Sequence, residues 1–464
     1  MCAISIKLVL TYIEINNNID LKDRIIDHPV SAQNMKEVVF MKKLLAMLIA
    51  LTLLVGMCSA FAEEEPIHLT LWTFQELHTQ LYKEMLEKWN ANPDNPKLDI
   101  DMQVYPYEDM HNKLTIALQS GEGAPDIVDI EINMFANYLK GDIQLAELND
   151  IVEPMQDHLV MSRFNNYAKD GKYYGIDHHI GACVMFYNTE ILEEAGIDYT
   201  TIKTWDDYHE AGKTVLEKTG KPMCTWESKD CWSIYPLVNQ HGGDWLTPDN
   251  EVRMDEQVVI DTLAFMRSML EDGTAVACPG GNHHAEEYYG WMDQGNCASV
   301  SMPFWYLNRF TDYMPDLSGK MKVAPMPLWP DGGHKSAQMG GTGTAVVKTS
   351  ANVDVAKQWL AYATLSFEGC VDTWLILGFD PIMTDVYGSE EMKAPNKFFD
   401  YYGDDIFDVL QGVLDDIPDT CLTEYFPAAG DIVRNQMAYD LVMSDKPVED
   451  IAKDCAEELR DQIF

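Results

Sequence analysis

Beyond residue 66, the spacing of apolar residues switches between that of strands and that of helices. Residues 67–72 (I-H-L-T-L-W) alternate apolar and polar positions, which predicts a strand. Apolar residues then recur at every fourth position, which predicts an amphipathic helix: Leu77, Leu81, Met85 and Trp89. Asn92-Pro93 ends this helix, because proline cannot continue it.

The same alternation continues through residue 131. We expect a strand at 98–105, a helix at 107–118 with Gly121 beyond its end, and a short strand within A-P-D-I-V-D-I-E at 124–131. The order is therefore βαβαβ. It predicts a mostly parallel sheet with helices on both faces.

A second α/β unit is predicted after the turn at 170–175. A strand is expected at 181–188, a helix around 191–195, and another helix that opens at T-W-D-D-Y, residues 204–208. Later elements are three strands and a helix, at 296–302, 321–324, 342–347 and 353–364. Because 464 residues exceed one ordinary core, two lobes are expected.

The first 62 residues are excluded from the fold. Residues 41–62 have the features of a secretory signal peptide: Lys42 and Lys43, an apolar run, and Ala60-Phe61-Ala62 as a cleavage site. Residues 1–40 are interpreted as an overextended start. Cys58 is a candidate for lipid attachment, but cleavage after Ala62 is favoured, and an uncleaved anchor is the further alternative.

The charge of the chain excludes one class of binding partner, and its cysteines leave the disulfide pairing open. The net charge of −42 repels phosphate backbones and anionic membranes, which argues against nucleic-acid binding. Two of the ten cysteines lie before residue 63, and no pair has CxxC spacing. A Cys224–Cys231 disulfide and buried free thiols both stay open.

Several short motifs occur in a specific order. They include A-P-D-I-V at 124–128, D-G-K-Y-Y-G-I at 170–176, Q-H-G-G-D-W at 240–245 and G-G-T-G-T-A-V at 340–346. This order and spacing resemble the extracellular solute-binding proteins (family 1) of carbohydrate ABC transporters. Residues 280–290 and 339–344 look closest to the branch that binds arabinose or lactose.

The resemblance implies an α/β fold of the two-lobed, type II periplasmic-binding-protein-like class. Lobe 1 would comprise residues 63–175 and 325–377, and lobe 2 residues 176–324 and 378–464. Crossing strands would lie near Tyr174–His178, Pro325–Pro327 and Gly378–Pro381. The ligand would lie in the cleft, and hinge closure of the lobes is what the importer would sense.

Sugar sites combine aromatic platforms with carboxylates, amides and backbone N–H groups. Matched to that chemistry, the resemblance implies these ligand-binding residues: Trp72, Glu76, Glu131, Asn133, His178, Trp232, Trp305, Gly341 and Asp380. Each has a structural alternative. The tryptophans suit a core, the glutamates a solvated surface, and the glycine a tight turn, which is slightly favoured there. His179, Glu286 and Tyr288 are further candidates for the cleft.

No metal, cofactor or catalytic residue is expected. His178-His179 and His283-His284 are adjacent pairs without zinc-site spacing, and GxSxG, Walker and complete GxGxxG motifs are absent from the sequence. A secreted glycoside hydrolase is the alternative, because acidic residues are abundant. A peptide- or metal-binding relative of the same fold is a third candidate.

The sequence therefore predicts an exported, non-enzymatic protein of the extracellular membrane face or periplasm. It would bind a mono- or oligosaccharide, with arabinose, arabino-oligosaccharide or a lactose-like sugar favoured, and deliver it to ABC permease subunits. We expect a monomer that meets the membrane only through a lipid anchor or the permease.

Overall fold

The structure is a computed structural model that describes residue 40, residues 43–44 and residues 65–463. Apart from those first three positions, the overextended start, the signal peptide and Cys58 lie outside the described residues. Residues 66–464 group into one compact unit. Among the helices in the described ranges, we find none with the length and apolar character needed to cross a membrane.

A five-stranded sheet forms the first lobe, in the order β2-β1-β3-β12-β6. β1 pairs in parallel with β2 and β3, whereas β12 runs antiparallel to β3 and β6. The strands are β1 (Ile67–Thr73), β2 (Leu98–Val104), β3 (Ile127–Glu131), β6 (Ile176–Asp177) and β12 (Thr342–Val346). The predicted βαβαβ unit is thereby confirmed, although β6 belongs to this sheet and the predicted boundary assigns it to lobe 2.

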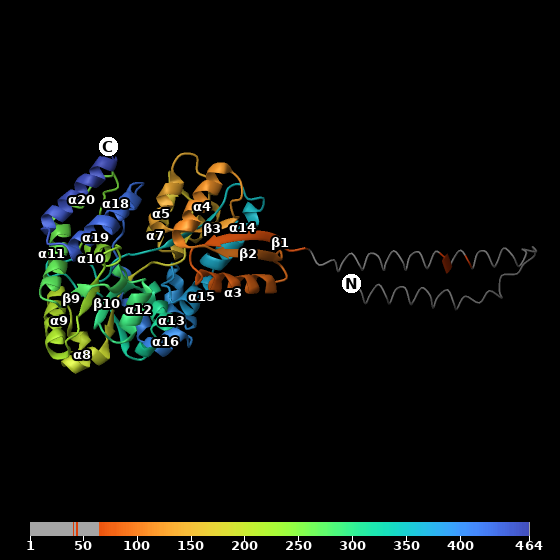
Figure 1. Cartoon of the computed structure of the whole chain (residues 1–464). Helices are drawn as coiled ribbons and strands as arrows, with labels where there is room; N and C mark the ends of the chain where they lie inside the picture. Colours follow the sequence, from red (N-terminus) through yellow and green to blue (C-terminus); the bar gives the residue numbers. More distant parts are fainter. Residues whose placement is uncertain (1–39, 41–42, 45–64, 464) are drawn as a thin grey trace, which may run out of the picture. The chain divides into compact units, whose positions relative to one another are not determined.

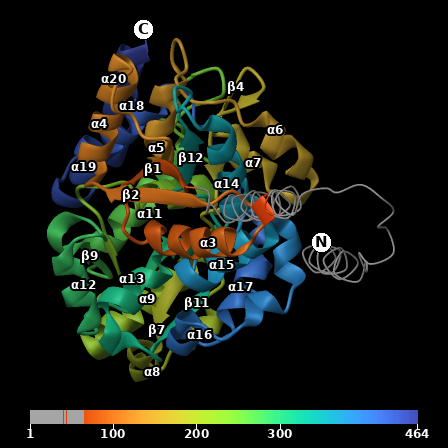
Figure 2. The same cartoon turned by 90° about the vertical axis from the view of Figure 1, so that its right-hand side faces the viewer.

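Two helices cover opposite faces of this sheet, as Figures 1 and 2 show for α3 (His78–Ala91) and α4 (Tyr107–Ser120). The predicted apolar stripe of α3 is buried: Leu81, Met85 and Trp89. α4 ends at Gly121, whose φ of 73° favours glycine. Near the sheet lie α5 (Ile132–Phe135), α6 (Asn149–Val152) and α7 (Met161–Asn165), and α14 (Val353–Leu365) and α15 (Phe367–Leu377) pack against α3.

The second lobe is built on an antiparallel sheet in the order β10-β7-β11. Its strands are β7 (Cys183–Asn188), β10 (Ser299–Pro303) and β11 (Met321–Ala324), and a parallel pair adds β8 (Cys224–Trp226) and β9 (Ala275–Ala277). The helices are α8 (Thr189–Ala195), α9 (Trp205–Thr219), α10 (Ile234–Gln240), α11 (Gln257–Glu271), α12 (Glu286–Asp293) and α13 (Leu307–Tyr313). A capping box of Thr204 and Asp207 starts α9, as the T-W-D-D-Y motif predicts.

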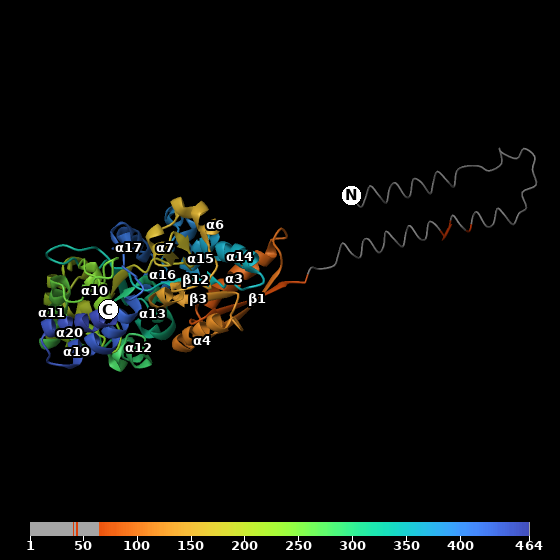
Figure 3. The same ribbon diagram turned by 90° about the horizontal axis from the view of Figure 1, so that it is seen from above.

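The C-terminal helices complete the second lobe. α16 (Lys397–Tyr402) and α17 (Ile406–Val413) pack against β11. α18 (Phe426–Ile432), the π-helical segment η11 (Val433–Met437) and α19 (Ala438–Met443) follow one another directly, before α20 (Val448–Ile463). Figures 1 and 3 place α19 and α20 beside α11, and α18 also contacts α5 of the first lobe.

Three crossing segments connect the lobes and lie next to one another. The first segment runs from β6 to β7, and the second returns from β11 to β12. The third follows α15 and contains Asp380. Ile180 N–H donates to the carbonyl of Asp380 at 2.9 Å, and Cys183 N–H donates to that of Ala337 at 2.9 Å. These bonds join all three segments, which form the hinge.

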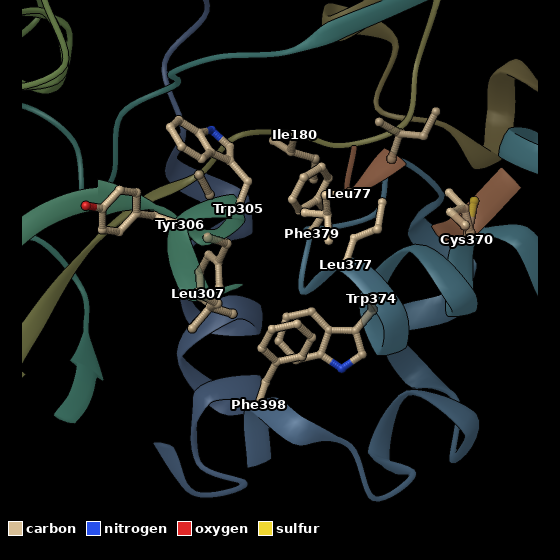
Figure 4. Close-up of a cluster of buried hydrophobic side chains, with 14 of the residues drawn as sticks. Leu77, Ile180, Trp305, Tyr306, Leu307, Cys370, Trp374, Leu377, Phe379 and Phe398 are labelled. Atoms are coloured by element: carbon tan, nitrogen blue, oxygen red, sulfur yellow. The ribbon is translucent and has the colours of Figure 1, made fainter. Parts of the chain in front are cut away.

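The hydrophobic core continues from one lobe to the other on the hinge side. Figure 4 shows part of this cluster, in which Leu77 and Trp374 come from the first lobe and Tyr306 and Leu307 from the second. Each lobe also has a cluster of its own. All eight cysteines in the described chain are free thiols, so the Cys224–Cys231 disulfide is not formed.

A fully buried ion pair lies at the first crossing. Arg163 donates to the carboxylate of Asp177 through Nη2 and through Nε at 3.1 Å, and the Tyr167 hydroxyl donates to the same oxygen at 2.6 Å. Burial opposes ionisation of Asp177, but the guanidinium of Arg163 keeps the pKa of this carboxyl below its usual value. The same Nη2 also donates to the Gly340 carbonyl at 2.8 Å, on the second crossing.

We expect Asp177→Asn to lower the free energy of unfolding by about 3–5 kcal/mol, because it leaves the Arg163 charge buried without its partner. Urea denaturation of the purified protein measures this loss. Glu210→Gln, in the exposed pair of Glu210 with Lys213, is the matched control and should leave the midpoint unchanged. Equal midpoints for both variants would contradict the role given to the ion pair.

Candidate ligand-binding site

A cavity of about 400 Å³ lies between the lobes. The first lobe contributes Phe74, Gln75, His78, Tyr107, Glu108, Glu131 and Asn133. The second lobe contributes Asp230, Trp232, Asn282, His284, Trp305, Arg309 and Arg434. The crossing segments contribute the floor, with His179, Gly340, Gly341, Thr342 and Phe379. The volume suits a small-molecule ligand, and the lining mixes aromatic, charged and amide groups.

The cavity brings together five of the nine predicted ligand-binding residues, from well-separated parts of the chain: Glu131, Asn133, Trp232, Trp305 and Gly341. The other four do not line it: Trp72, Glu76, His178 and Asp380. Glu286 and Tyr288, the further candidates on α12, do not line it either, whereas His179 does.

Three aromatic rings form one wall of the cavity in the second lobe. The ring of Trp305 packs edge-to-face with Trp232 at 5.2 Å between centroids and stacks with His284 at 5.6 Å. The Trp305 indole N–H donates to the Met339 carbonyl at 3.0 Å, which fixes the ring. Figure 4 shows this indole at the edge of the shared core. We call Trp232, His284 and Trp305 the aromatic corner, and it offers rigid apolar faces to a ligand.

The opposite wall carries a carboxylate held by donors. Glu131 ends β3 and caps α5, where its side chain accepts the Asn133 N–H at 2.9 Å and the Asn133 side-chain amide at 2.8 Å. The Tyr107 hydroxyl donates to it at 2.9 Å. Burial raises the pKa of Glu131 to about 7, against these donors. This wall therefore presents several hydrogen-bonding groups to a ligand.

Two arginines line the cavity from the second lobe, and sequence reasoning did not find them. Arg434 lies in the π-helical segment η11, with Nε 3.4 Å from Asp230 and Nη1 2.8 Å from Asp431. Arg309 lies on α13 and donates to the Asn308 side chain at 2.8 Å. π-helical segments often occur at functional sites, but their position depends on tertiary packing, and the spacing of residues in the sequence does not predict it.

Trp72 and Glu76 lie away from the cavity. Trp72 is buried in the first lobe, where Tyr105 packs against its ring at 5.4 Å and the Lys113 ammonium lies 4.1 Å from the ring centroid. Glu76 is exposed at the start of α3. Phe74 and Gln75 line the cavity instead. Residues 72–76 therefore reach the cavity through the middle of the segment and through neither predicted residue.

His178 and Asp380 lie behind the cavity, in the hinge. The His178 ring stacks on Phe379, and burial lowers its pKa to about 4. His179 lines the cavity in its place, because adjacent residues of an extended segment point to opposite sides. The Asp380 carboxylate accepts the Ala182 N–H at 2.7 Å, and burial raises its pKa to about 7.

Gly341 contributes backbone only. A Cβ at this position would come 2.7 Å from the Asp177 carboxylate and 2.7 Å from the Tyr167 hydroxyl, and closer still to Arg163. The glycine therefore leaves room for the buried ion pair beneath the cavity floor. Among the described residues, no group of three or more His, Cys, Asp or Glu side chains is arranged to hold a metal ion.

Comparison with known protein families gives one family. A family model described as bacterial extracellular solute-binding protein matches residues 75–366. The arabinooligosaccharide-binding protein of Bacillus subtilis (strain 168) is 43% identical, over 89% of this chain and 96% of that protein. The protein of the same name from Halalkalibacterium halodurans is 45% identical, over 79% and 82%. The lactose-binding protein of Rhizobium radiobacter is 27% identical, over 67% and 73%.

Solved structures share the fold at lower identity. The ABC transporter associated binding protein of B. animalis subsp. lactis Bl-04, in complex with beta-1,6-galactobiose, matches with a TM-score of 0.72 and 21% identity, over 86% of this chain and 98% of that one. The GacH receptor of Streptomyces glaucescens gives the same TM-score at 20% identity and the same coverage. The predicted two-lobed α/β fold is confirmed.

The stability of the protein should depend on the protonation of Glu131. Because its pKa is about 7 when folded and ordinarily 4.5, the folded state holds a proton that the unfolded state releases between these pH values. The contribution of Glu131 to the free energy of unfolding therefore falls as pH rises through this window, by on the order of 2–3 kcal/mol, in addition to the contributions of other buried carboxyls with a raised pKa, such as Asp380. Urea denaturation at pH 4.5, 6 and 7.5 measures the slope.

Glu131→Gln should show a flatter slope, because it cannot release a proton. Glu108→Gln alters an exposed carboxylate of the same cavity and should keep the wild-type slope. A Glu131→Gln protein with the wild-type slope would assign the pH dependence to another group.

Proposed function

The chain belongs to the bacterial extracellular solute-binding protein family, and we propose that it is the substrate-binding component of a carbohydrate ABC importer. The observation that carries this proposal is the cavity between the lobes, with the aromatic corner on one side and Glu131 and Asn133 on the other. A sugar has apolar C–H faces and a rim of hydroxyls. The two walls suit these two kinds of surface.

An arabino-oligosaccharide is the favoured ligand. The two relatives above 40% identity are both arabinooligosaccharide-binding proteins by name, whereas the lactose-binding protein is 27% identical. A lactose-like disaccharide is therefore the second candidate. The cavity volume of about 400 Å³ admits a short oligosaccharide in preference to a long chain.

Binding works by closure of the lobes about the hinge. A sugar ring stacks on Trp305, with Trp232 at right angles to it, and hydroxyls bond to Glu131, Asn133 and the arginines. The proposed lobes are residues 63–175 with 325–377, and residues 176–324 with 378–464, except that β6 (Ile176–Asp177) pairs within the sheet of the first lobe. Permease subunits recognise the closed, loaded form, and release to them requires reopening.

No chemical step is part of this function. The relatives named above are binding proteins, and the family model describes solute binding. A glycoside hydrolase needs an acid and a base or nucleophile free to act on the sugar. Of the three carboxylates that line the cavity, Glu131 is engaged by Tyr107 and Asn133, and Asp230 lies beside Arg434. Only Glu108 is left, and one carboxylate does not make the pair that hydrolysis requires.

The protein acts outside the cytoplasmic membrane, as its family membership implies. The signal peptide at 41–62, cleavage after Ala62 and the alternative lipid anchor at Cys58 belong to this proposal. So do a monomeric state and the absence of a cofactor. The net charge of −42 disfavours nucleic acid as a partner.

Isothermal titration with arabinose, lactose and short arabino-, xylo- and malto-oligosaccharides tests the function, with chromatography of the sugars afterwards. We expect intact arabino-oligosaccharide to bind. Trp305→Ala should lose about 0.5–1.5 kcal/mol of stacking and the buried ring area in addition, which together weaken binding tenfold or more.

Trp72→Phe is the control, because Trp72 lies outside the cavity, and it should bind as the wild type does. Shorter sugars in the chromatogram would favour the hydrolase. A folded Trp305→Ala protein with wild-type affinity would remove the aromatic corner from the site.

A further inference from the structure

Glu227 is a buried carboxylate that the proposed binding function does not use. It follows β8 and is fully buried, and it does not line the cavity. Among the described residues, no lysine or arginine pairs with it. The basic side chain that lies within 4 Å of it in this part of the chain is His283, with Nδ1 3.5 Å from the carboxylate. A buried carboxylate without a cation is costly, so its bonds within the protein have to explain it.

The two oxygens of Glu227 accept from two different loops. Oε1 accepts the His283 N–H at 2.7 Å. Oε2 accepts the Ser233 N–H at 3.0 Å and the Ser233 hydroxyl at 3.3 Å. The Ser233 hydroxyl in turn accepts the Glu227 N–H at 2.8 Å, so Glu227 and Ser233 are bonded to each other through both backbone and side chain.

These two loops carry four residues of the cavity lining. The first loop, residues 227–233, presents Asp230 and Trp232, and the second, residues 278–285, presents Asn282 and His284. A second link joins the loops, because the N–H groups of Ser228 and Lys229 both donate to the Gly281 carbonyl at 3.0 Å.

The aromatic corner spans both loops. The Trp232 ring from the first loop packs edge-to-face against His284 from the second, at 5.6 Å, and against Trp305 beyond it. His284 stacks on Trp305, with an interplanar angle of 18°. A relative shift of the loops would therefore separate the rings that form the wall.

Burial of Glu227 carries an electrostatic cost. Burial, with the nearby Asp230 charge, raises the pKa of Glu227 to about 8. A hydrophobic residue would fill the same space without this cost, but it would not accept from His283 and Ser233.

We propose that Glu227 is a positioning residue of the binding site, which holds the two loops in register so that Trp232, His284 and Trp305 form one wall. It acts through Trp232 and His284 and does not touch the ligand. The inference rests on the proposed function for its effect on affinity, but its effect on the loops is independent of any ligand.

The first test uses ¹⁹F NMR of the 5-fluorotryptophan protein, with the Trp232 resonance assigned from Trp232→Phe. In Glu227→Gln, an isosteric change that removes one acceptor, the Trp232 resonance should shift or broaden, and that of Trp359 in the first lobe should not. Asp244→Asn is the matched control, because Asp244 is also a buried carboxylate that accepts two backbone N–H groups, from Trp245 and Cys421, away from the cavity. It should leave the Trp232 resonance unchanged.

The second test is a double-mutant cycle for arabinotriose affinity, measured by titration on folded protein. Glu227→Gln should weaken binding about tenfold in the wild-type background and less than threefold when Trp232 is already alanine, because both changes remove the same wall. Glu227→Ala should behave alike with a larger loss, and the Gln variant suffices if the Ala variant does not fold.

Equal losses in both backgrounds, or an unchanged Trp232 resonance in Glu227→Gln, would overturn the positioning role. Failure of the wild type to bind arabinotriose or any sugar of the panel would instead overturn the proposed function. The NMR comparison would still decide the inference about Glu227.

Discussion

The buried ion pair of Arg163 with Asp177 joins the places where the chain crosses between the lobes. Asp177 lies at the first crossing, and the same guanidinium binds the Gly340 carbonyl on the second. Two unlike charges buried together tolerate little displacement, because each would lose its ionic partner without regaining water. The floor of the cavity is built on this pair, and Gly341 keeps the space above it open.

The two walls that rise from this floor differ in chemistry. The second lobe supplies rigid rings and two guanidinium groups, and the first supplies a carboxylate surrounded by amide and hydroxyl donors. Neither wall alone would select a sugar, since rings bind many flat apolar ligands and carboxylates bind many polar ones. Selection arises where both must be satisfied at once, which is why the lobes have to meet around the ligand.

Local patterns in the sequence were sufficient to predict the first lobe. Strand β1, helix α3 and helix α4 each bury one face, so their periodicity could be read directly, and the alternation of strands and helices gave the sheet between two helix layers. In the antiparallel sheet of the second lobe, the short strands β7 and β10 are buried on both faces, and no sequence pattern indicated how they pair. The family resemblance supplied what periodicity could not, namely that the segments of the two lobes are interleaved in the sequence.

Of the ligand-binding tryptophans that the resemblance implied, Trp232 and Trp305 line the cavity and Trp72 does not. The packing of a ring at a strand end depends on contacts such as Lys113, which come from elsewhere in the chain. Arg434 could not be predicted for a similar reason, because the π-helical segment η11 sets the direction of its side chain.

That helical irregularity constrains how this chain can vary in evolution. The π-helical segment η11 takes up one residue more than an ordinary helical turn, and this extra residue is accommodated between α18, which contacts α5, and α19, which contacts α11. Loss of one amino acid within 433–437 would give a regular helical turn and leave α19 facing α11, but it would change which residue of the segment faces the cavity, where Arg434 now lies. A change in length at these positions would therefore alter the cavity wall and leave the packing of the C-terminal helices in place.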